Sequence, residues 1–283
     1  MKSKVIWMYW HQGFDQVPPI IQSCVQQWRD LHPDWEIHLL DQYNIYEYVQ
    51  PLDIDANILN KMTLAHRSDL LRTQLLIKYG GVWADPTCFP LQKLEGWLPQ
   101  YISAGFFFFY KPGRDRIISN WFISAEQGND LLKKLYQALI NYWNSNNFKN
   151  LGRQDTSYEK LINRILNRNL VLPRLWFTLI FTKILRIYPY MVYHFMLYHL
   201  MSKDNKIKQQ FDQMPKLSAE PPHALQRAGM MSPLSDTIKT IIDDKQVPLF
   251  KLTWKIKQDK IPQDSNLAYL FNQINKNEHT DKA

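Results

Sequence analysis

Strand-like and helix-like segments alternate through the first 145 residues, and this alternation constrains the fold more than any other feature. Strands show as apolar runs or as alternating apolar residues, whereas helices show apolar residues three and four positions apart. The predicted strands are 5–10, 35–39, 82–84 and 102–110, and the predicted helices are 57–79, 129–143 and one that begins at Pro18-Pro19. Because helices that alternate with strands pack against a common sheet, we predict an α/β fold.

The second half of the chain has a different character. Residues 170–201 are apolar and aromatic but are interrupted by Arg174, Lys183 and Arg186, and the longest charge-free stretch, Ile187 to Ser202, is too short to span a bilayer. Two interpretations stay open for this segment: an element that lies at a membrane surface, and a buried pair of helices.

The net charge of +8 at pH 7 belongs to one part of the chain. Residues 160–216 contain ten lysines and arginines against two acids, whereas residues 1–100 contain eight against eleven. The acidic first part, and glycines and arginines that are not arranged as in RNA-binding modules, argue against a nucleic-acid-binding protein. A basic segment favours contact with an acidic surface such as anionic lipids.

The two cysteines, Cys24 and Cys88, bear on the compartment. Two thiols are typical of a reducing environment and cannot form a Cys-rich zinc site. The apolar run at 5–10 is too short for a signal peptide, and no small-residue cleavage site follows it. We therefore expect a cytoplasmic protein.

One stretch brings chemically active residues to a defined place. On the predicted helix, Asp69 lies on the same side as Arg72. Gly80-Gly81 is a typical helix stop, and the short strand that follows ends at Asp85. Ligands bind at the carboxyl ends of strands in open α/β sheets, so Asp85 is a candidate ligand-binding carboxylate. Both acids also have a purely structural interpretation. Asp69 can be a helix residue that pairs with Arg72, and Asp85 can be a turn residue before a proline.

The spacing S-D-x-x-R followed by Y-G-G-h-x-x-D, where h is apolar, resembles the sugar-nucleotide signature of glycosyltransferases with the GT-A fold. The opening "IWMYWHQG" and the later "PDWE" resemble more specifically the capsular polysaccharide synthesis glycosyltransferases, relatives of the DXD-containing sugar transferases. The resemblance covers residues 4–145, and "FKLTWK" at 250–255 fits a returning family element.

The resemblance implies a GT-A-like fold with a central mixed sheet. It implies a nucleotide-sugar-binding core at 1–150, a basic, aromatic and mainly helical acceptor or membrane-proximal region at 151–230, and a C-terminal return to the core at 231–283.

The resemblance also implies roles for individual residues. Asp69 matches the aspartate that bonds the ribose or sugar of the donor, Arg72 matches the arginine that supports this contact, and Asp85 matches the first carboxylate of the DXD motif. The expected donor-binding residues are Trp7, Tyr9, Trp10, His11, Gln12, Ser68, Asp69, Arg72, Gly81, Asp85, Thr87 and Lys255. For His11 and Gln12, a donor contact and a hydrogen bond within their own loop stay equally open.

The chain departs from the family pattern at Thr87, where the second aspartate is expected. In that pattern the carboxylates hold Mn²⁺ or Mg²⁺, which neutralises the departing diphosphate. Thr87 offers only a neutral hydroxyl, so the predicted metal site keeps Asp85 as its carboxylate and is weakened. Basic side chains are the alternative source of positive charge, and Lys251 and Lys255, at the end of a predicted strand, are candidates.

The predicted function is transfer of a sugar from a nucleotide diphosphate donor, expected to be a UDP-sugar, to a saccharide acceptor. The resemblance implies retention of anomeric configuration and a role in bacterial capsule, O-antigen or other surface polysaccharide synthesis. A lipid-linked acceptor would bring the protein into peripheral contact with the inner face of the cell membrane. The alternative is a catalytically silent relative that acts as a scaffold or regulator, because Thr87 breaks the motif.

Overall fold

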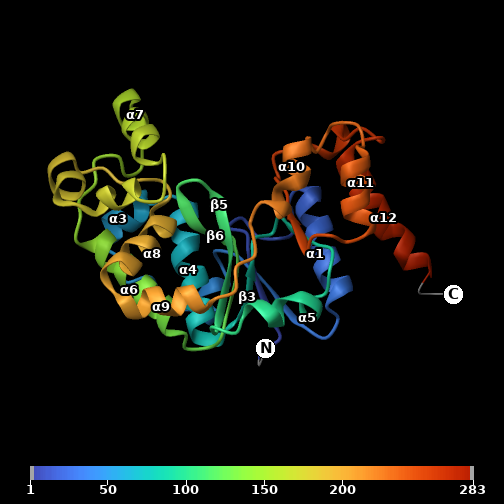
Figure 1. Cartoon of the computed structure of the whole chain (residues 1–283), viewed down its shortest axis with the longest axis horizontal. Coiled ribbons are helices and arrows are strands. Elements are labelled where there is room, and N and C mark those ends of the chain that lie inside the picture. The colour runs from blue at the N-terminus through green and yellow to red at the C-terminus, as the bar shows by residue number, and fades with distance from the viewer. Residues whose placement is uncertain (1–2, 281–283) are drawn as a thin grey trace. The chain divides into compact units, whose positions relative to one another are not determined.

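The computed structural model describes residues 3–280 and divides into two compact units (Figure 1). Each unit is built from segments far apart in the sequence. Unit 1 contains Tyr43–Trp83 and Tyr101–Ser218, and unit 2 contains Lys4–Gln42, Ala84–Gln100 and the chain from Ala219 onward. The predicted division into three consecutive regions stays a prediction.

Unit 2 contains one parallel and one antiparallel strand pair. Its elements are β1 (Val5–Tyr9), α1 (Pro19–Leu31), β2 (Glu36–Leu40), β4 (Cys88–Pro90), α5 (Leu94–Trp97), η1 (Leu98–Tyr101), η4 (Pro221–His223), α10 (Ala224–Ala228), α11 (Asp236–Asp243), β7 (Leu249–Lys251), η5 (Gln258–Lys260) and α12 (Asn266–Thr280). β1 runs parallel to β2, from Val5↔Glu36 to Tyr9↔Leu40, and β4 runs antiparallel to β7. A proline begins α1, as predicted, because the first helical turn needs no backbone donor.

The core of unit 2 joins the two ends of the described chain. Ile20 and Cys24 of α1 pack in one cluster with Phe89 of β4 and Phe250 of β7, and the cluster continues into α11 and α12. Figure 1 shows α10, α11 and α12 close together in this unit. The chain after residue 219 therefore returns to pack on segments from the beginning of the sequence.

Unit 1 combines an antiparallel hairpin with a layer of helices. Its elements are α2 (Ile45–Tyr48), α3 (Ala56–Lys61), α4 (Leu64–Tyr79), β3 (Gly81–Ala84, whose last residue belongs to unit 2), β5 (Phe106–Gly113), β6 (Arg116–Ala125), α6 (Asp130–Asn144), α7 (Ser157–Leu166), η2 (Leu172–Phe177), η3 (Ile180–Leu185), α8 (Val192–Lys203) and α9 (Asn205–Gln213). β5 and β6 pair antiparallel, and α4, α6 and α8 lie side by side (Figure 1).

The observed class matches the prediction. The strand pairing is mixed, because unit 2 contains the parallel pair β1–β2 and unit 1 contains the antiparallel pair β5–β6. The chain between β6 and β7 is mainly helical. The predicted α/β fold with a central mixed sheet and a mainly helical C-terminal region is therefore confirmed.

The predicted helix at 57–79 is two helices, α3 and α4. Met62 adopts an extended conformation between them, with φ −67° and ψ 138°. Thr63 then caps α4, because its Oγ1 accepts a hydrogen bond from His66 N at 3.3 Å, and Asp55 caps α3 in the same way. Such side chains favour a helix start because the first N–H groups of a helix lack backbone partners.

The strand predicted at 102–110 is β5, which begins at Phe106. Its partner β6 was not predicted from the sequence. Nearly every residue of β6 is buried, so it lacks the alternation by which half-exposed strands are recognised.

The segment 170–201 contains a buried part and an exposed part, and its contact with a membrane stays a prediction. Most of α8 is buried, whereas η2, η3 and the residues between them expose Leu175, Leu179, Ile180 and Ile184. No helix within residues 3–280 is long and apolar enough to cross a membrane.

Candidate functional site

Two glycines set the geometry that leads to Asp85. Gly80 ends α4 with φ 69°, and a Cβ at this position would lie 2.7 Å from the backbone nitrogen of Gln127, so only glycine fits. Gly81 begins β3, and its carbonyl oxygen accepts a hydrogen bond from Ser124 Oγ at 3.1 Å. All four residues of β3 are buried, so Asp85 follows a firmly held strand.

Asp85 lies in a cluster with Thr87 and Lys251, which we call the Asp85 cluster. Lys251 Nζ is 3.0 Å from Asp85 Oδ2 and donates a hydrogen bond to Thr87 Oγ1. Lys251 pairs with Cys88 in the β4–β7 register, and Leu252 N donates to the Thr87 carbonyl oxygen at 2.8 Å, so the backbone fixes the lysine in place. The side chains of Lys251 and Asp85 are 16% and 27% exposed, which leaves both accessible to a ligand.

Two tryptophans that follow strands of unit 2 contact each other. Trp10 comes directly after β1, and Trp254 comes shortly after Lys251. Their ring centroids are 5.6 Å apart in an edge-to-face arrangement, and Trp254 is 45% exposed. Exposed aromatic faces bind flat heteroaromatic groups by stacking.

The remaining residues predicted around β1 have different surroundings. Trp7 is buried and stacks on His38 with ring centroids 4.6 Å apart, and its predicted donor contact stays a prediction. Tyr9 Oη lies 2.9 Å from His11 Nδ1, a hydrogen bond within the loop region. Gln12 is exposed.

Lys251, rather than Lys255, is the lysine of the Asp85 cluster. The side chain of Lys255 is exposed, its backbone nitrogen donates to Thr253 Oγ1 at 3.4 Å, and its predicted donor contact stays a prediction. Strand β7 ends at Lys251, so Lys255 lies beyond the strand.

Asp69 and Arg72 lie next to each other on α4 in unit 1, as their spacing predicts. Arg72 Nη2 is 3.5 Å from Asp69 Oδ1, and Asn120 of β6 donates from Nδ2 to the same oxygen at 2.8 Å. Arg72 donates in turn to the Asn120 carbonyl oxygen and to Ser68 Oγ, the latter at 3.0 Å. We call these four residues the Asp69 cluster.

The Asp69 cluster is buried and held on several sides. Asp69 is 7% exposed and Arg72 is 5% exposed. The Arg72 guanidinium lies 4.7 Å from the ring centre of Trp83, and Thr73 Oγ1 donates to the Asp69 carbonyl oxygen at 2.7 Å. Burial raises the pKa of the nearby Tyr193 hydroxyl, which therefore stays neutral. Buried and mutually bonded charges hold their side chains in place, so this cluster suits orientation of a group.

The residues of the Asp85 cluster fit a divalent cation poorly. Mn²⁺ and Mg²⁺ prefer carboxylate oxygens, and the described residues include no group of three or more His, Cys, Asp or Glu side chains that could hold a metal ion. Asp85 Oδ2 and Thr87 Oγ1 each receive a hydrogen bond from Lys251. The metal implied by the resemblance stays a prediction that rests on one carboxylate.

Sequence reasoning missed Asn120, and it placed Lys251 only as a candidate. Asn120 is 51 positions from Asp69, in a strand that was not predicted. Lys251 is 166 positions from Asp85. The sequence feature that indicated it was its place in a short strand-like run, "FKLTWK". Neither partner can be deduced from local spacing.

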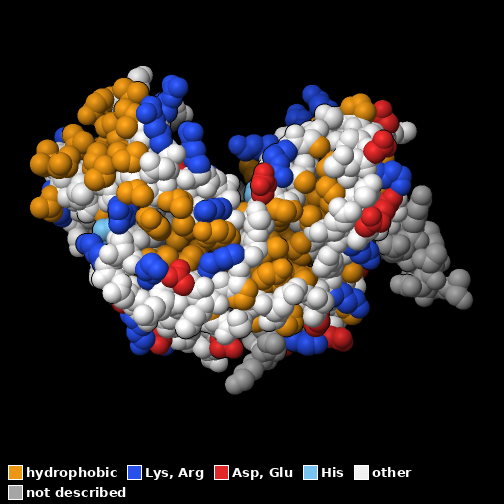
Figure 2. All heavy atoms as spheres, viewed as in Figure 1, with side chains coloured by type: hydrophobic (Ala, Val, Ile, Leu, Met, Phe, Trp, Pro, Cys, Tyr) orange, Lys and Arg blue, Asp and Glu red, His pale blue; other side chains and the backbone are white. Residues whose placement is uncertain are grey.

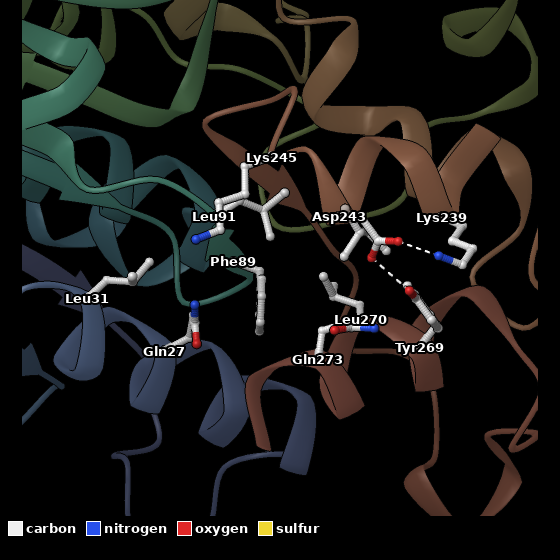
Figure 3. A pocket seen from close by; sticks show the side chains of 11 residues that line it. Gln27, Leu31, Phe89, Leu91, Lys239, Asp243, Lys245, Tyr269, Leu270 and Gln273 are labelled. Atoms are coloured by element: carbon white, nitrogen blue, oxygen red, sulfur yellow. Dashed lines mark hydrogen bonds and ion pairs between the residues drawn. The ribbon is translucent and has the colours of Figure 1, made fainter. Parts of the chain in front are cut away.

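A pocket elsewhere in unit 2 contains none of the predicted site residues (Figure 3). Its apolar lining comes from Leu31, Phe89, Leu91, Ile242 and Leu270. Three of the polar side chains labelled in Figure 3 bond to one another: Asp243 pairs with Lys239 and accepts a hydrogen bond from Tyr269 Oη at 2.7 Å. In unit 2 we therefore take the Asp85 cluster, and not this pocket, as the candidate site, and the candidate residues of unit 1 are those of the Asp69 cluster.

Comparison with known proteins identifies the class of this chain. A family model described as capsular polysaccharide synthesis protein matches residues 1–150, which is more than half of the chain. The chain belongs to this family, which confirms the resemblance found in the sequence.

Two relatives are described as glycosyltransferases. The O-glycosyltransferase braB of Annulohypoxylon truncatum is 32% identical over 160 residues, covering 50% of this chain and 38% of that protein. The O-glycosyltransferase PaGT of Phomopsis amygdali is 26% identical over 159 residues, covering 50% and 39%. The match thus spans well under half the length of these relatives.

The solved structure of PaToxG Glycosyltransferase is similar with a TM-score of 0.42 and 15% identity, over 85% of this chain and 84% of that one.

Proposed function

We propose that the protein is a glycosyltransferase that moves a sugar from a nucleotide diphosphate donor to a hydroxyl of a saccharide acceptor. The observation that carries this proposal is the Asp85 cluster, in which a carboxylate and an ammonium group are fixed and accessible at the end of β3. Membership of the family and the names of the two relatives support it.

Departure of the nucleoside diphosphate is the difficult step in such a reaction, so stabilisation of its negative charge dominates. We propose that the Asp85 cluster faces the diphosphate and that Trp10 and Trp254 stack on the base, which we expect to be uracil. The resemblance implies that Asp69 and Arg72, in unit 1, bond and orient the donor sugar, and this role stays a prediction. Retention of configuration is inferred from the resemblance alone, and we assign no catalytic base.

The acceptor is inferred from what is said of the family and its relatives. The family description refers to capsular polysaccharide, and both named relatives are O-glycosyltransferases. We therefore infer a saccharide hydroxyl in the synthesis of a surface polysaccharide, such as capsule or O-antigen, with the growing chain carried on a lipid.

A matching donor is expected to raise the melting temperature of the protein by several degrees. A ligand at 100 times its Kd stabilises the folded state by about 2.7 kcal/mol. A thermal-shift screen of UDP-, GDP-, CDP- and dTDP-sugars, each with and without Mn²⁺, measures this, and the free sugars serve as controls. Failure of every nucleotide sugar to bind would contradict the proposal. Binding without slow release of nucleoside diphosphate would instead favour the silent scaffold.

An exposed apolar face in unit 1 suggests where a lipid-linked acceptor is met. Figure 2 shows hydrophobic side chains gathered over α7 and the segment that follows it. The exposed large apolar residues of this face are Tyr158, Leu161, Ile165, Val171, Leu175, Leu179, Ile180 and Ile184. A separate buried cluster around Trp176 forms the local core of this part of unit 1. The exposed apolar side chains are therefore not needed to build that core. Contiguous apolar surface of this kind marks an interaction site.

The charges of this face favour an anionic membrane over other partners. Residues 160–203 contain no aspartate or glutamate, and their basic residues are Lys160, Arg164, Arg168, Arg174, Lys183, Arg186 and Lys203. Basic side chains lie beside the hydrophobic ones in Figure 2. Apolar insertion together with Lys and Arg near anionic headgroups is the chemistry of peripheral membrane attachment. We propose that α7, η2 and η3 contact the inner leaflet.

Replacing Leu179 and Ile184 with serine is expected to weaken binding to anionic liposomes by more than about tenfold, because both apolar side chains would leave the lipid. Both residues are highly exposed, so the fold should tolerate the change. Flotation with phosphatidylserine vesicles at low and high salt measures the binding, and Leu64→Ser, an exposed site on α4, is the control. The membrane proposal would be contradicted if the unaltered protein did not float, or if the double variant only disrupted self-association.

A further inference from the structure

Lys251 occupies the place where the family pattern calls for a metal ion. The lysine is positioned by backbone pairing, since β7 pairs with β4 and Lys251 lies opposite Cys88. Its ammonium group contacts Asp85 Oδ2 at 3.0 Å and also donates to Thr87 Oγ1. These are the side chains at the first and third positions of the motif.

The charges of the cluster balance without a divalent ion. In the family pattern, two carboxylates face one doubly positive ion. Here Thr87 removes one negative charge, and Lys251 supplies one positive charge next to the carboxylate that remains. A divalent ion bound to Asp85 Oδ2 and Thr87 Oγ1 would have to displace the ammonium group, which it would also repel. Threonine at position 87 and lysine at position 251 therefore together keep the cluster neutral without a metal ion.

We propose that the Lys251 ammonium group is the built-in cation of this site and binds the diphosphate of the donor, so that donor binding and transfer need no divalent metal. This inference rests on the proposed function. During transfer the bond between C1 and the diphosphate oxygen breaks, and its electron pair leaves with the diphosphate. The acceptor oxygen forms the new bond to C1, and its proton passes to the departing diphosphate. Lys251 keeps its own proton and stabilises the charge that develops. Asp85 and Thr87 act as positioning residues for the ammonium group.

The partial exposure of the cluster is consistent with this role. Lys251 donates to Asp85 Oδ2 and Thr87 Oγ1, and its positive charge attracts the negative oxygens of a diphosphate. Its side chain is 16% exposed, so solvent screens that contact only in part. A lysine is a compact point charge, which suits a phosphate oxygen.

Titration with UDP and UMP in the presence of a chelator tests the inference, because the two probes differ by one phosphate. The unaltered protein is expected to bind UDP more tightly than UMP without metal. Lys251→Met is expected to weaken UDP binding by at least about tenfold and to leave UMP binding nearly unchanged. Lys251→Arg keeps the charge and should retain most of the affinity for UDP. Lys260→Met, an exposed lysine of unit 2, is the matched control.

A metal titration of the same variants gives a second test. In Lys251→Met, Asp85 and Thr87 lose their lysine donor, so Mn²⁺ is expected to restore part of the affinity for UDP. In the unaltered protein, Mn²⁺ should change the affinity little. UDP binding by the unaltered protein that is lost with chelator and restored by Mn²⁺ would overturn the inference while supporting the proposed function. Failure of UDP and of every other nucleoside diphosphate to bind, with or without Mn²⁺, would overturn both.

Discussion

Replacement of Asp85 with alanine is expected to lower sugar transfer by about 100- to 1,000-fold, because the cation that stabilises the departing diphosphate would lose its anchor. Asp85 anchors the positive charge that we place against the diphosphate. This holds whether the charge belongs to Lys251 or to a metal ion. The experiment therefore tests the position of the site and not the identity of its cation.

Initial rates with the donor found in the binding screen measure the effect of Asp85→Ala. Asp244→Ala is the control, because Asp244 is an exposed acid of unit 2 at the end of α11 and should leave the rate unchanged. Asp85→Asn preserves the size of the side chain and removes its charge, and it should lose most of the activity as well. Undiminished turnover in Asp85→Ala would refute the placement of the donor at this cluster.

Asp69→Ala is expected to lower the free energy of unfolding by about 3–5 kcal/mol, because it leaves a buried arginine without its carboxylate. Arg72 is 5% exposed, and Asn120 would lose the acceptor of its Nδ2 group as well. Urea denaturation followed by circular dichroism measures the change.

The control for Asp69→Ala is Asp130→Ala. Asp130 pairs with Lys133 at the same i,i+3 spacing, but both side chains are more than half exposed, so this pair should contribute less than about 1 kcal/mol. Equal losses in the two variants would contradict the view that Asp69 neutralises a buried charge.

A double replacement separates stability from function at this cluster. Asp69→Leu combined with Arg72→Met removes both buried charges and should recover much of the stability lost in Asp69→Ala. If the cluster orients the donor sugar, the double variant will still fail to transfer sugar. Recovery of both stability and transfer would limit the cluster to a structural role.

The elements predicted correctly from the sequence are those specified by neighbouring residues. The opening strand, α1 and the stop at Gly80-Gly81 follow from apolar spacing, from a proline at a helix start and from a backbone conformation that favours glycine. The break between α3 and α4 was missed because no glycine or proline marks it, although Thr63 carries a capping signal. The buried strand β6 was missed because burial on both faces removes the alternation.

By itself, the sequence determined the α/β class, the family, the closeness of Asp69 to Arg72 and the delivery of Asp85 at a strand end. These features depend on residues that are close in the sequence, because helix and strand periodicity fix which of their side chains are neighbours. Only the tertiary structure decided that Asn120 completes the Asp69 cluster and that Lys251 lies against Asp85. Both arise from strands that reach their partners across long stretches of chain. A shift of one residue in the β4–β7 register would turn Lys251 to the other face, and such a register is set by packing of the whole unit.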